Sequence, residues 1–275
     1  MLTDAEKEQK NTPSSQPGAS AEPILPRRDL RSILLMVFVV IATLIGATCA
    51  IISLIFDPSA RAFHFGVARR WARVLLKASG IRVEVEGLEN FDPNRPYVFM
   101  SNHQCNFDIV AILAGLPAHF RVIAKSEVMK VPGFGWTVRR GGHIIVDRTD
   151  RAQAFASYND AARKIQAGTS ILVFAEGTRS ADGTVGPFKK GGFVLAIQAG
   201  VPIVPITISG GRKILPRQKI VFRKGVMKIV VDKPIETRSY RYEDRDDLIK
   251  RVREVIISNL REDEVDTLNK ALGLQ

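Results

Sequence analysis

A long uninterrupted apolar run lies in the first quarter of the chain. Residues 33–56 are 24 consecutive residues without a formal charge. A helix of this length is about 36 Å long, enough to cross a hydrocarbon core of about 30 Å with some tilt. A buried core helix is the alternative interpretation, but such helices are rarely apolar on every side for so long. We therefore expect a membrane-embedded helix.

Basic residues flank this run at both ends, so the positive-inside rule assigns it no orientation. The arrangement also suits a helix, or a helix pair, that enters one leaflet and returns. The flanking arginines are Arg27, Arg28 and Arg31 before the run and Arg61, Arg69, Arg70 and Arg73 after it.

The next segment, residues 62–79, is amphipathic, because basic residues are interspersed among apolar residues that fall on one helical face. An interfacial helix and a helix packed on a globular core both give this pattern, so both interpretations stay open. The apolar face consists of Phe63, Val67, Trp71, Val74, Leu75 and Ala78.

Beyond Gly80, strand-like and helix-like patterns alternate. Period-two alternation predicts strands, and a 3.6-residue period predicts helices, with Asp150 as the N-cap of one of them. This alternation predicts a single α/β domain over residues 80–261, with a mostly parallel central sheet flanked by helices. The expected strands are 81–85, 97–100, 121–124, 143–146, 171–174 and 203–208, with shorter ones near Ile220 and Ile229; the expected helices are 107–114, 150–168, 193–199 and 248–260.

The two ends of the chain lack such periodicity. Residues 1–26 are rich in Ser, Pro, Gln, Asn and Glu and are expected to form a disordered tail. A signal peptide is excluded because Asp4, Glu6 and Glu8 stand where it needs a basic start. We assign residues 27–79 to a membrane-associated helical segment. The polar residues 262–275 are assigned to a C-terminal tail, with a frayed helix as the alternative.

Composition narrows the class of protein. Of the 275 residues 45% are hydrophobic, so the chain can bury a core and is not disordered throughout. Its two cysteines, Cys49 and Cys105, cannot make a disulfide framework, which favours a catalytic region in a reducing compartment. The net charge of +12 indicates a nucleic acid, an anionic membrane surface or an acidic partner.

A polar turn with His103 and Asp108 follows the expected strand at 97–100. At a strand-to-helix turn, Asp108 can fold back and accept a hydrogen bond from one ring nitrogen of His103, which leaves the other nitrogen free as a general base. A helix-capping Asp beside a surface His is the simpler alternative. Cys105 is interpreted as a small spacer rather than a nucleophile, and the four histidines lack the spacing of metal ligands.

A second polar turn follows the expected strand at 171–174. Gly177 allows close backbone approach, Thr178 offers a hydroxyl, and Arg179 offers a planar cation that suits a phosphate. Glu176 can orient this arginine or accept from a ligand hydroxyl. A polar turn with an internal Glu–Arg pair is the alternative.

Two further cations, Lys125 and Arg148, stand at strand ends. Ligands of open α/β sheets bind at the carboxyl ends of the strands, so we expect these cations to converge with His103 and Arg179. The combination predicts an anionic substrate.

Four motifs stand in the order and approximate spacing found in the glycerolipid acyltransferases. They are Asn102-His103 with Asp108, the block from Lys125 to Arg148, Glu176-Gly177-Thr178-Arg179, and Val-Pro-Ile-Val-Pro at 201–205. Over about residues 80–230 the chain most resembles the bacterial 1-acylglycerol-3-phosphate acyltransferase type, and the four motifs together are specific although each alone is not. Ala175 departs from the proline usual in the family, which affects the stiffness of the turn rather than the chemistry.

The resemblance implies that His103 is the general base and Asp108 its orienting partner, and that Arg179 binds the acceptor phosphate. It implies transfer of a fatty acyl group from acyl-CoA or acyl-acyl carrier protein to the free sn-2 hydroxyl of 1-acylglycerol-3-phosphate. The product is phosphatidic acid for phospholipid biosynthesis, and no metal or other cofactor is needed. The implied substrate-binding residues are Lys125, Arg148, Glu176, Gly177, Thr178 and Arg179.

The expected partners are a lysophospholipid acceptor, the acyl thioester and an anionic membrane, with no nucleic acid. The expected location is the bacterial inner membrane, with the catalytic domain on the cytoplasmic side. One alternative is the same chemistry on another lysophospholipid or a lyso-aminolipid. Another is a membrane-tethered basic binding module, but such a module interleaves its cations with exposed aromatics, and only 7% of this chain is aromatic.

Overall fold

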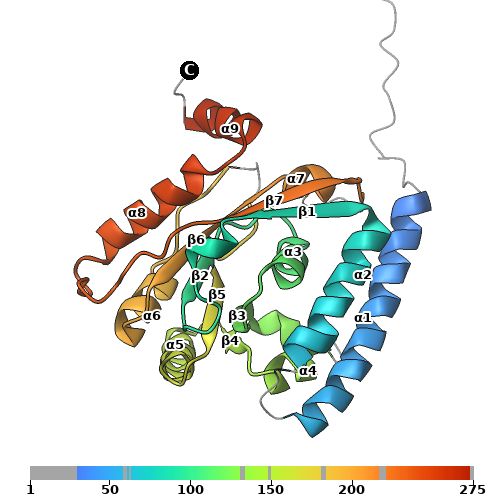
Figure 1. Ribbon diagram of the computed structural model, residues 1–275, viewed down its shortest axis with the longest axis horizontal. Coiled ribbons are helices and arrows are strands. Elements are labelled where there is room, and N and C mark those ends of the chain that lie inside the picture. Colours follow the sequence, from blue (N-terminus) through green and yellow to red (C-terminus); the bar gives the residue numbers. More distant parts are fainter. Residues whose placement is uncertain are drawn as a thin grey trace, which may run out of the picture.

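The computed structural model describes residues 30–57, 61, 63–130, 134–147, 150–180, 184–216 and 221–272 (Figure 1). The expected disordered tail at 1–26 lies outside these residues, as do Arg27, Arg28 and Arg148. Within them, the predicted α/β domain with a mostly parallel sheet flanked by helices is confirmed.

Among the described residues, the sheet contains seven strands in the order β1-β7-β6-β2-β5-β3-β4. Neighbouring strands are parallel except β6 and β7, which are antiparallel. The strands are β1 (Ile81–Glu86), β2 (Val98–Ser101), β3 (Phe120–Lys125), β4 (Ile144–Val146), β5 (Ser170–Phe174), β6 (Ile203–Ser209) and β7 (Gly225–Val231).

Helices surround this sheet and precede it. The α-helices are α1 (Leu30–Phe56), α2 (Arg69–Ser79), α3 (Asp108–Gly115), α4 (Phe134–Arg140), α5 (Arg151–Gln166), α6 (Gly191–Ala199), α7 (Gly211–Ile214), α8 (Arg245–Ser258) and α9 (Glu262–Leu272). Other helical segments are the π-helix η1 (Phe63–Ala68) and the 3-10 helices η2 (Leu88–Asn90) and η3 (Ser126–Lys130).

Burial follows the position of each strand in the sheet. β2 and β6 are buried at every residue, as expected for central strands covered on both faces, whereas the edge strand β1 alternates. In the register of β2 and β5, Ser101 pairs with Phe174. The two predicted functional turns therefore leave the same edge of the sheet side by side.

Two apolar layers hold the helices on the sheet. On one face, Leu75 of α2 and Ile112 of α3 belong to one buried cluster. On the other face, Phe193 of α6 and Leu248 of α8 belong to a second cluster, which α5 also joins. Figure 1 shows these two groups of helices on opposite sides of the strands. The result is a three-layer α/β arrangement.

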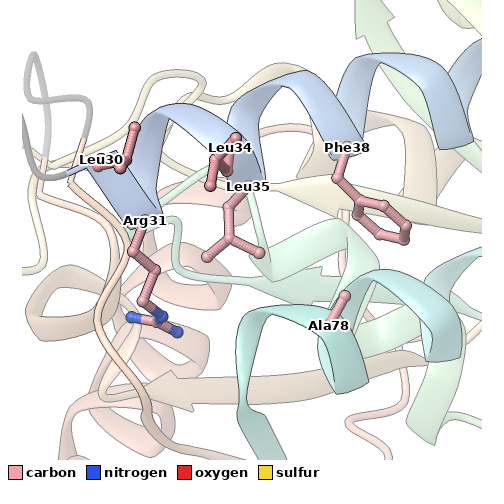
Figure 2. A pocket seen from close by; sticks show the side chains of 6 residues that line it. All are labelled: Leu30, Arg31, Leu34, Leu35, Phe38 and Ala78. Carbon is pink, nitrogen blue, oxygen red and sulfur yellow. The ribbon is translucent and has the colours of Figure 1, made fainter.

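α1 packs along α2 and both of its halves contact the domain (Figure 1). Near its start, Arg31 donates to the backbone carbonyls of Phe222 and Ser79 at 3.0 and 3.1 Å. Midway, a Cβ on Gly46 would come within 2.9 Å of the Trp71 ring, so a glycine permits this close approach. A groove of about 540 Å³ between the start of α1 and the end of α2 is lined mostly by apolar side chains (Figure 2).

The outer face of α1 is apolar and exposed. Leu34, Leu44 and Phe56 keep 61%, 56% and 82% of their surface accessible. Among the described residues, α1 is the one helix long and apolar enough to cross a membrane. The sequence prediction of a helix here is confirmed, and its insertion into a bilayer stays a prediction.

α2 occupies most of the amphipathic segment 62–79 and favours the core-packed interpretation. Ala72 and Leu76 are buried in the core cluster, and the Arg69 side chain donates to the carbonyl of Leu113 at the end of α3. Val74, which was expected on the apolar face, is instead 49% exposed.

The carboxyl-terminal part differs from expectation in one place, and one expected strand there is not tested. Residues 217–220 lie outside the described part of the chain, so the strand expected near Ile220 is not described; β7 is the strand expected near Ile229. Residues 262–272, expected as a tail, form α9, which buries Glu264 and Leu268. Two buried positions four residues apart fall on one helical face, a signal too short to predict the helix from sequence.

Candidate active site

His103 lies in the loop between β2 and α3. Its Nδ1 is 2.8 Å from Oδ2 of Asp108, the first residue of α3, so the contact expected from the sequence is present. The same Oδ2 accepts the backbone N–H groups of Gln104 at 2.6 Å and Cys105 at 2.9 Å. Because Oδ2 is an acceptor in all these contacts, we assign the Nδ1 proton to His103, which leaves Nε2 as the free acceptor.

Asp108 is fully buried, whereas the His103 side chain keeps 18% of its surface accessible. The carboxylate therefore acts behind the imidazole and cannot meet a ligand directly. It is held by loop residues that precede it, and not by a bond to the first turn of α3, which separates this arrangement from an ordinary helix cap.

The His103 ring is held on its flat side as well. The Phe174 ring, at the end of β5, stacks on it with centroids 4.0 Å apart and planes 19° apart. The preceding residue, Asn102, is fixed by two side-chain bonds of 2.8 Å to the backbone of Ile208 in β6. Ser180 N–H donates to the His103 carbonyl at 2.8 Å. Three segments of the chain thus fix the position of this histidine.

Glu176 is buried and contacts the backbone on both sides. Its Oε1 accepts the N–H of His103 at 2.9 Å, and its Oε2 accepts the N–H of Gly186 at 3.0 Å. Burial raises the pKa of this carboxyl, and the two N–H groups partly oppose that rise. Of the roles considered from the sequence, neither an ion pair with Arg179 nor exposure to a ligand fits these contacts.

A cavity of about 1170 Å³ opens beside this assembly. His103, Lys125, Gly177, Thr178 and Arg179 all line it, so the expected convergence occurs for these residues. Arg148 lies outside the described part of the chain.

Lys125 makes an ion pair with Glu127, another lining residue. Asp108 and Glu176 do not line the cavity and lie behind it.

Much of the remaining lining is apolar and comes from several elements. Ala47 and Ala50 of α1, Trp71 of α2, Leu113 of α3 and Val173 of β5 contribute to it. Since α1 supplies part of this wall, the apolar helix and the histidine share one cavity. A hydrocarbon chain suits such a lining, because its burial is favourable wherever water is displaced from apolar surface.

Two other chemistries receive no support from the geometry. Cys105 is buried, and burial together with the Asp108 carboxylate raises the pKa of its thiol, which keeps it from acting as a thiolate. Among the described residues, no group of three or more His, Cys, Asp and Glu side chains is placed to hold a metal ion.

Sequence reasoning missed the residues that fix His103 from a distance. Asn102 belongs to the first motif and Phe174 precedes the third, but the contacts of Phe174 with His103 and of Asn102 with Ile208 depend on the strand order. Gly186 gave no signal, because only the fold brings its N–H to Glu176.

Comparisons with known proteins show which chains this one is similar to. A family model described as "Acyltransferase" matches residues 82–209. The chloroplastic 1-acyl-sn-glycerol-3-phosphate acyltransferase BAT2 of Brassica napus is 35% identical over 184 residues, which cover 66% of this chain and 53% of that protein. The 1-acyl-sn-glycerol-3-phosphate acyltransferase alpha of Mus musculus is 34% identical over 191 residues, covering 69% of this chain and 67% of that protein.

A solved structure is similar as well. The crystal structure of the 1-acyl-sn-glycerophosphate acyltransferase of Thermotoga maritima superposes with a TM-score of 0.71 at 27% identity, covering 82% of this chain and 93% of that one. The matched part spans about half the length of the plant relative.

Proposed function

The chain belongs to the 1-acyl-sn-glycerol-3-phosphate acyltransferase family, and we propose that it transfers a fatty acyl group from a thioester to the free sn-2 hydroxyl of 1-acylglycerol-3-phosphate. The product is phosphatidic acid. The observation that carries this proposal is His103 on the wall of a large and partly apolar cavity, with the Asp108 carboxylate 2.8 Å behind its Nδ1.

His103 is the general base in this reaction. Its Nε2 takes the proton of the acceptor hydroxyl while the hydroxyl oxygen attacks the thioester carbonyl carbon. The imidazolium that forms is stabilised by Asp108 through Nδ1–H. When the tetrahedral intermediate collapses, the carbon–sulfur bond breaks, and the departing sulfur takes the proton back from Nε2. A thioester has a good leaving group, so this sequence needs no acyl-enzyme and no metal.

The acceptor phosphate binds the cations that line the cavity. Arg179 offers a bidentate fork, and Lys125 at the end of β3 offers a second positive charge. Arg148 remains part of the proposed phosphate site on sequence grounds. Gly177 and Thr178 stand beside Arg179 in the same lining, whereas we assign Glu176 a positioning role in place of direct binding.

The acyl chain occupies the apolar part of the cavity, and the thioester carbonyl lies at His103. Both acyl-CoA and acyl-acyl carrier protein present this thioester to the site. The net charge of +12 fits either donor, because both are acidic.

α1 places the site at the membrane. The apolar outer face of α1 inserts into the hydrocarbon, and the arginines that flank the helix contact anionic head groups. Because α1 contacts the domain near its start through Arg31 and again midway through Gly46, we propose that it lies in one leaflet beside the domain, as half of a helix pair with α2. The location we propose is the cytoplasmic side of the bacterial inner membrane.

An acceptor panel tests the proposal. The purified protein receives a labelled acyl thioester and, in parallel, lysophosphatidate, larger lysophospholipids and a lyso-aminolipid. The proposal expects kcat/KM for lysophosphatidate to exceed the others by at least about tenfold, which corresponds to about 1.4 kcal/mol. If kcat/KM for a larger lysophospholipid or the lyso-aminolipid equals or exceeds that for lysophosphatidate, that lipid is the acceptor. If the protein binds these lipids but transfers no acyl group, it is the membrane-tethered basic binding module.

A further inference from the structure

Helix α9 contains a buried carboxylate that the proposed reaction does not use. Glu264 keeps 8% of its surface accessible, and its Oε1 accepts the backbone N–H of Gly210 at 2.8 Å. Its Oε2 is buried without a hydrogen-bond partner among the described residues. A buried carboxylate with one unpaired oxygen is costly, which directs attention to the contact that its other oxygen makes.

The N–H that Glu264 accepts belongs to the turn between β6 and α7. Gly210 has φ +87, and a Cβ there would come within 2.4 Å of the Val226 carbonyl oxygen, so only glycine fits this turn. The next residue, Gly211, donates its N–H to Oε1 of Gln104 at 2.8 Å. Adjacent peptide groups of one turn therefore contact α9 and the residue that follows His103.

Gln104 and Gly211 in turn fix Asp108. The Gln104 N–H donates to Asp108 Oδ2 at 2.6 Å, and this oxygen also contacts His103 Nδ1. A Cβ on Gly211 would lie 2.9 Å from Asp108 Oδ1, so the turn directly backs the carboxylate. A shift of the turn would move the carboxylate that orients His103.

The start of α9 is attached to the same turn at two more places. Lys213 of α7 makes an ion pair of 2.6 Å with Asp263, and the Arg261 N–H donates to Ser209 Oγ at 3.4 Å. Both contacts lie within three residues of Glu264. The helix is therefore fixed to the segment that backs Asp108, although it is far from His103 in sequence.

We propose that Glu264 is a positioning residue for the catalytic pair, which acts through Gly210, Gly211 and Gln104 on Asp108. This inference rests on the proposed function for its kinetic consequence. Removal of the Oε1 acceptor leaves a buried N–H unpaired and lets the turn move. When a distant mutation displaces a catalytic group by about 1 Å, the reaction rate falls by up to about a hundredfold.

The test compares three variants of the full-length protein in detergent or vesicles. Glu264→Met keeps the size and helix propensity of the side chain but removes the acceptor, whereas Glu264→Gln retains an oxygen for Gly210. Asp266→Met makes the same replacement at an exposed position of α9 and serves as the matched control. Gln104→Met removes the side-chain oxygen that accepts the Gly211 N–H. This variant takes the place of Glu264→Met if the Glu264→Met protein does not fold.

Two readouts are measured. The first is acyl transfer to lysophosphatidate, for which we expect Glu264→Met to lower kcat about tenfold with KM unchanged, and Glu264→Gln and Asp266→Met to stay within about twofold. The second is carbethoxylation of His103 by diethyl pyrocarbonate, followed by peptide mapping as a function of pH. Because this reagent attacks neutral imidazole, the profile reports the environment of His103 without catalysis. Glu264→Met is expected to shift the profile, and Glu264→Gln to restore it.

Two results would overturn the inference: a Glu264→Met protein that matches Asp266→Met in both readouts, or a Glu264→Gln protein as impaired as Glu264→Met. If no protein, wild type included, transfers acyl groups, the proposed function fails. The carbethoxylation profile still decides the inference in that case.

Discussion

His103 and Phe174 stack face to face, with ring centroids 4.0 Å apart and planes 19° apart. The two residues are 71 positions apart in sequence, and the parallel pairing of β2 with β5 brings them together. The stack fixes the plane of the imidazole, while Asp108 fixes its rotation within that plane. The direction of Nε2 is therefore set before any substrate enters.

Replacement of Phe174 tests this restraint. Phe174→Leu keeps an apolar side chain but removes the flat surface, so the imidazole can rotate, and kcat is expected to fall about tenfold with the acceptor KM unchanged. Phe174→Tyr keeps the ring and is expected to stay within about threefold of wild type. Steady-state kinetics measure both, and equal rates for the Leu and wild-type proteins would remove Phe174 from the account.

Glu176 offers a second test, because the positioning role assigned to it and the substrate-binding role expected from the sequence predict different kinetics. Glu176→Ala leaves the N–H groups of His103 and Gly186 without their acceptor, at about 1–3 kcal/mol of unfolding free energy each. We expect kcat to fall between about tenfold and a hundredfold and the KM for the acceptor to stay constant. A rise in KM at unchanged kcat would show that Glu176 contacts the substrate.

His64 makes stability depend on pH. It is buried with Nε2 2.9 Å from the Ala118 carbonyl oxygen, and burial, reinforced by the neighbouring His119, lowers its pKa from 6.5 to about 3. As pH falls below 6.5 the unfolded chain protonates this imidazole and the folded protein does not. The free energy of unfolding therefore decreases by up to about 1.4 kcal/mol per pH unit until pH approaches 3.

Thermal unfolding of the detergent-solubilised protein between pH 7 and pH 5 measures this effect. Tm is expected to fall with pH in the wild type, and less steeply in His64→Phe. His143 has the same lowered pKa of about 3 from burial, so some pH dependence remains in that variant. If Tm falls equally steeply with pH in the wild type and in His64→Phe, the lowered pKa of His64 does not account for the pH dependence.

Lysine substitutions on the exposed apolar face of α1 test whether this face inserts into the membrane. Ile41 and Leu44 are 51% and 56% exposed near the middle of the helix. In Ile41→Lys/Leu44→Lys each lysine costs about 2.5–3.5 kcal/mol in the hydrocarbon, so flotation with anionic vesicles should fall more than tenfold while the domain stays folded. Thr267→Lys, on exposed α9, is the control and is expected to leave flotation unchanged. Undiminished flotation of the double variant would exclude insertion of this face.

Local patterns were enough for much of this structure. The seven strands and the helices α3, α5, α6 and α8 were expected from local patterns, whereas the short helices α4 and α7 were not. His103 meets Asp108 because both lie in one short turn. Convergence of Lys125 and Arg179 with His103 followed from the rule that parallel strands present their carboxyl ends at one edge.

Contacts between distant segments could not be derived in this way. The role of Glu176 depends on Gly186 and on a backbone N–H 73 residues away, and a motif does not specify whether its carboxylate faces a ligand or the main chain. α9 was expected as no more than a tail or a frayed helix, because a short polar helix with two buried residues resembles a tail. Its relation to Gly210 exists only once β6 is in place.

The central claim is that His103 removes a proton from the acceptor hydroxyl. Its most direct test is acyl transfer to lysophosphatidate by His103→Ala, measured with a labelled acyl thioester on protein whose Tm and vesicle flotation match the wild type. The account predicts a loss of at least about 10²–10⁴-fold in kcat, the range that general base catalysis contributes. Activity within a few-fold of wild type in that folded, membrane-bound protein would contradict it.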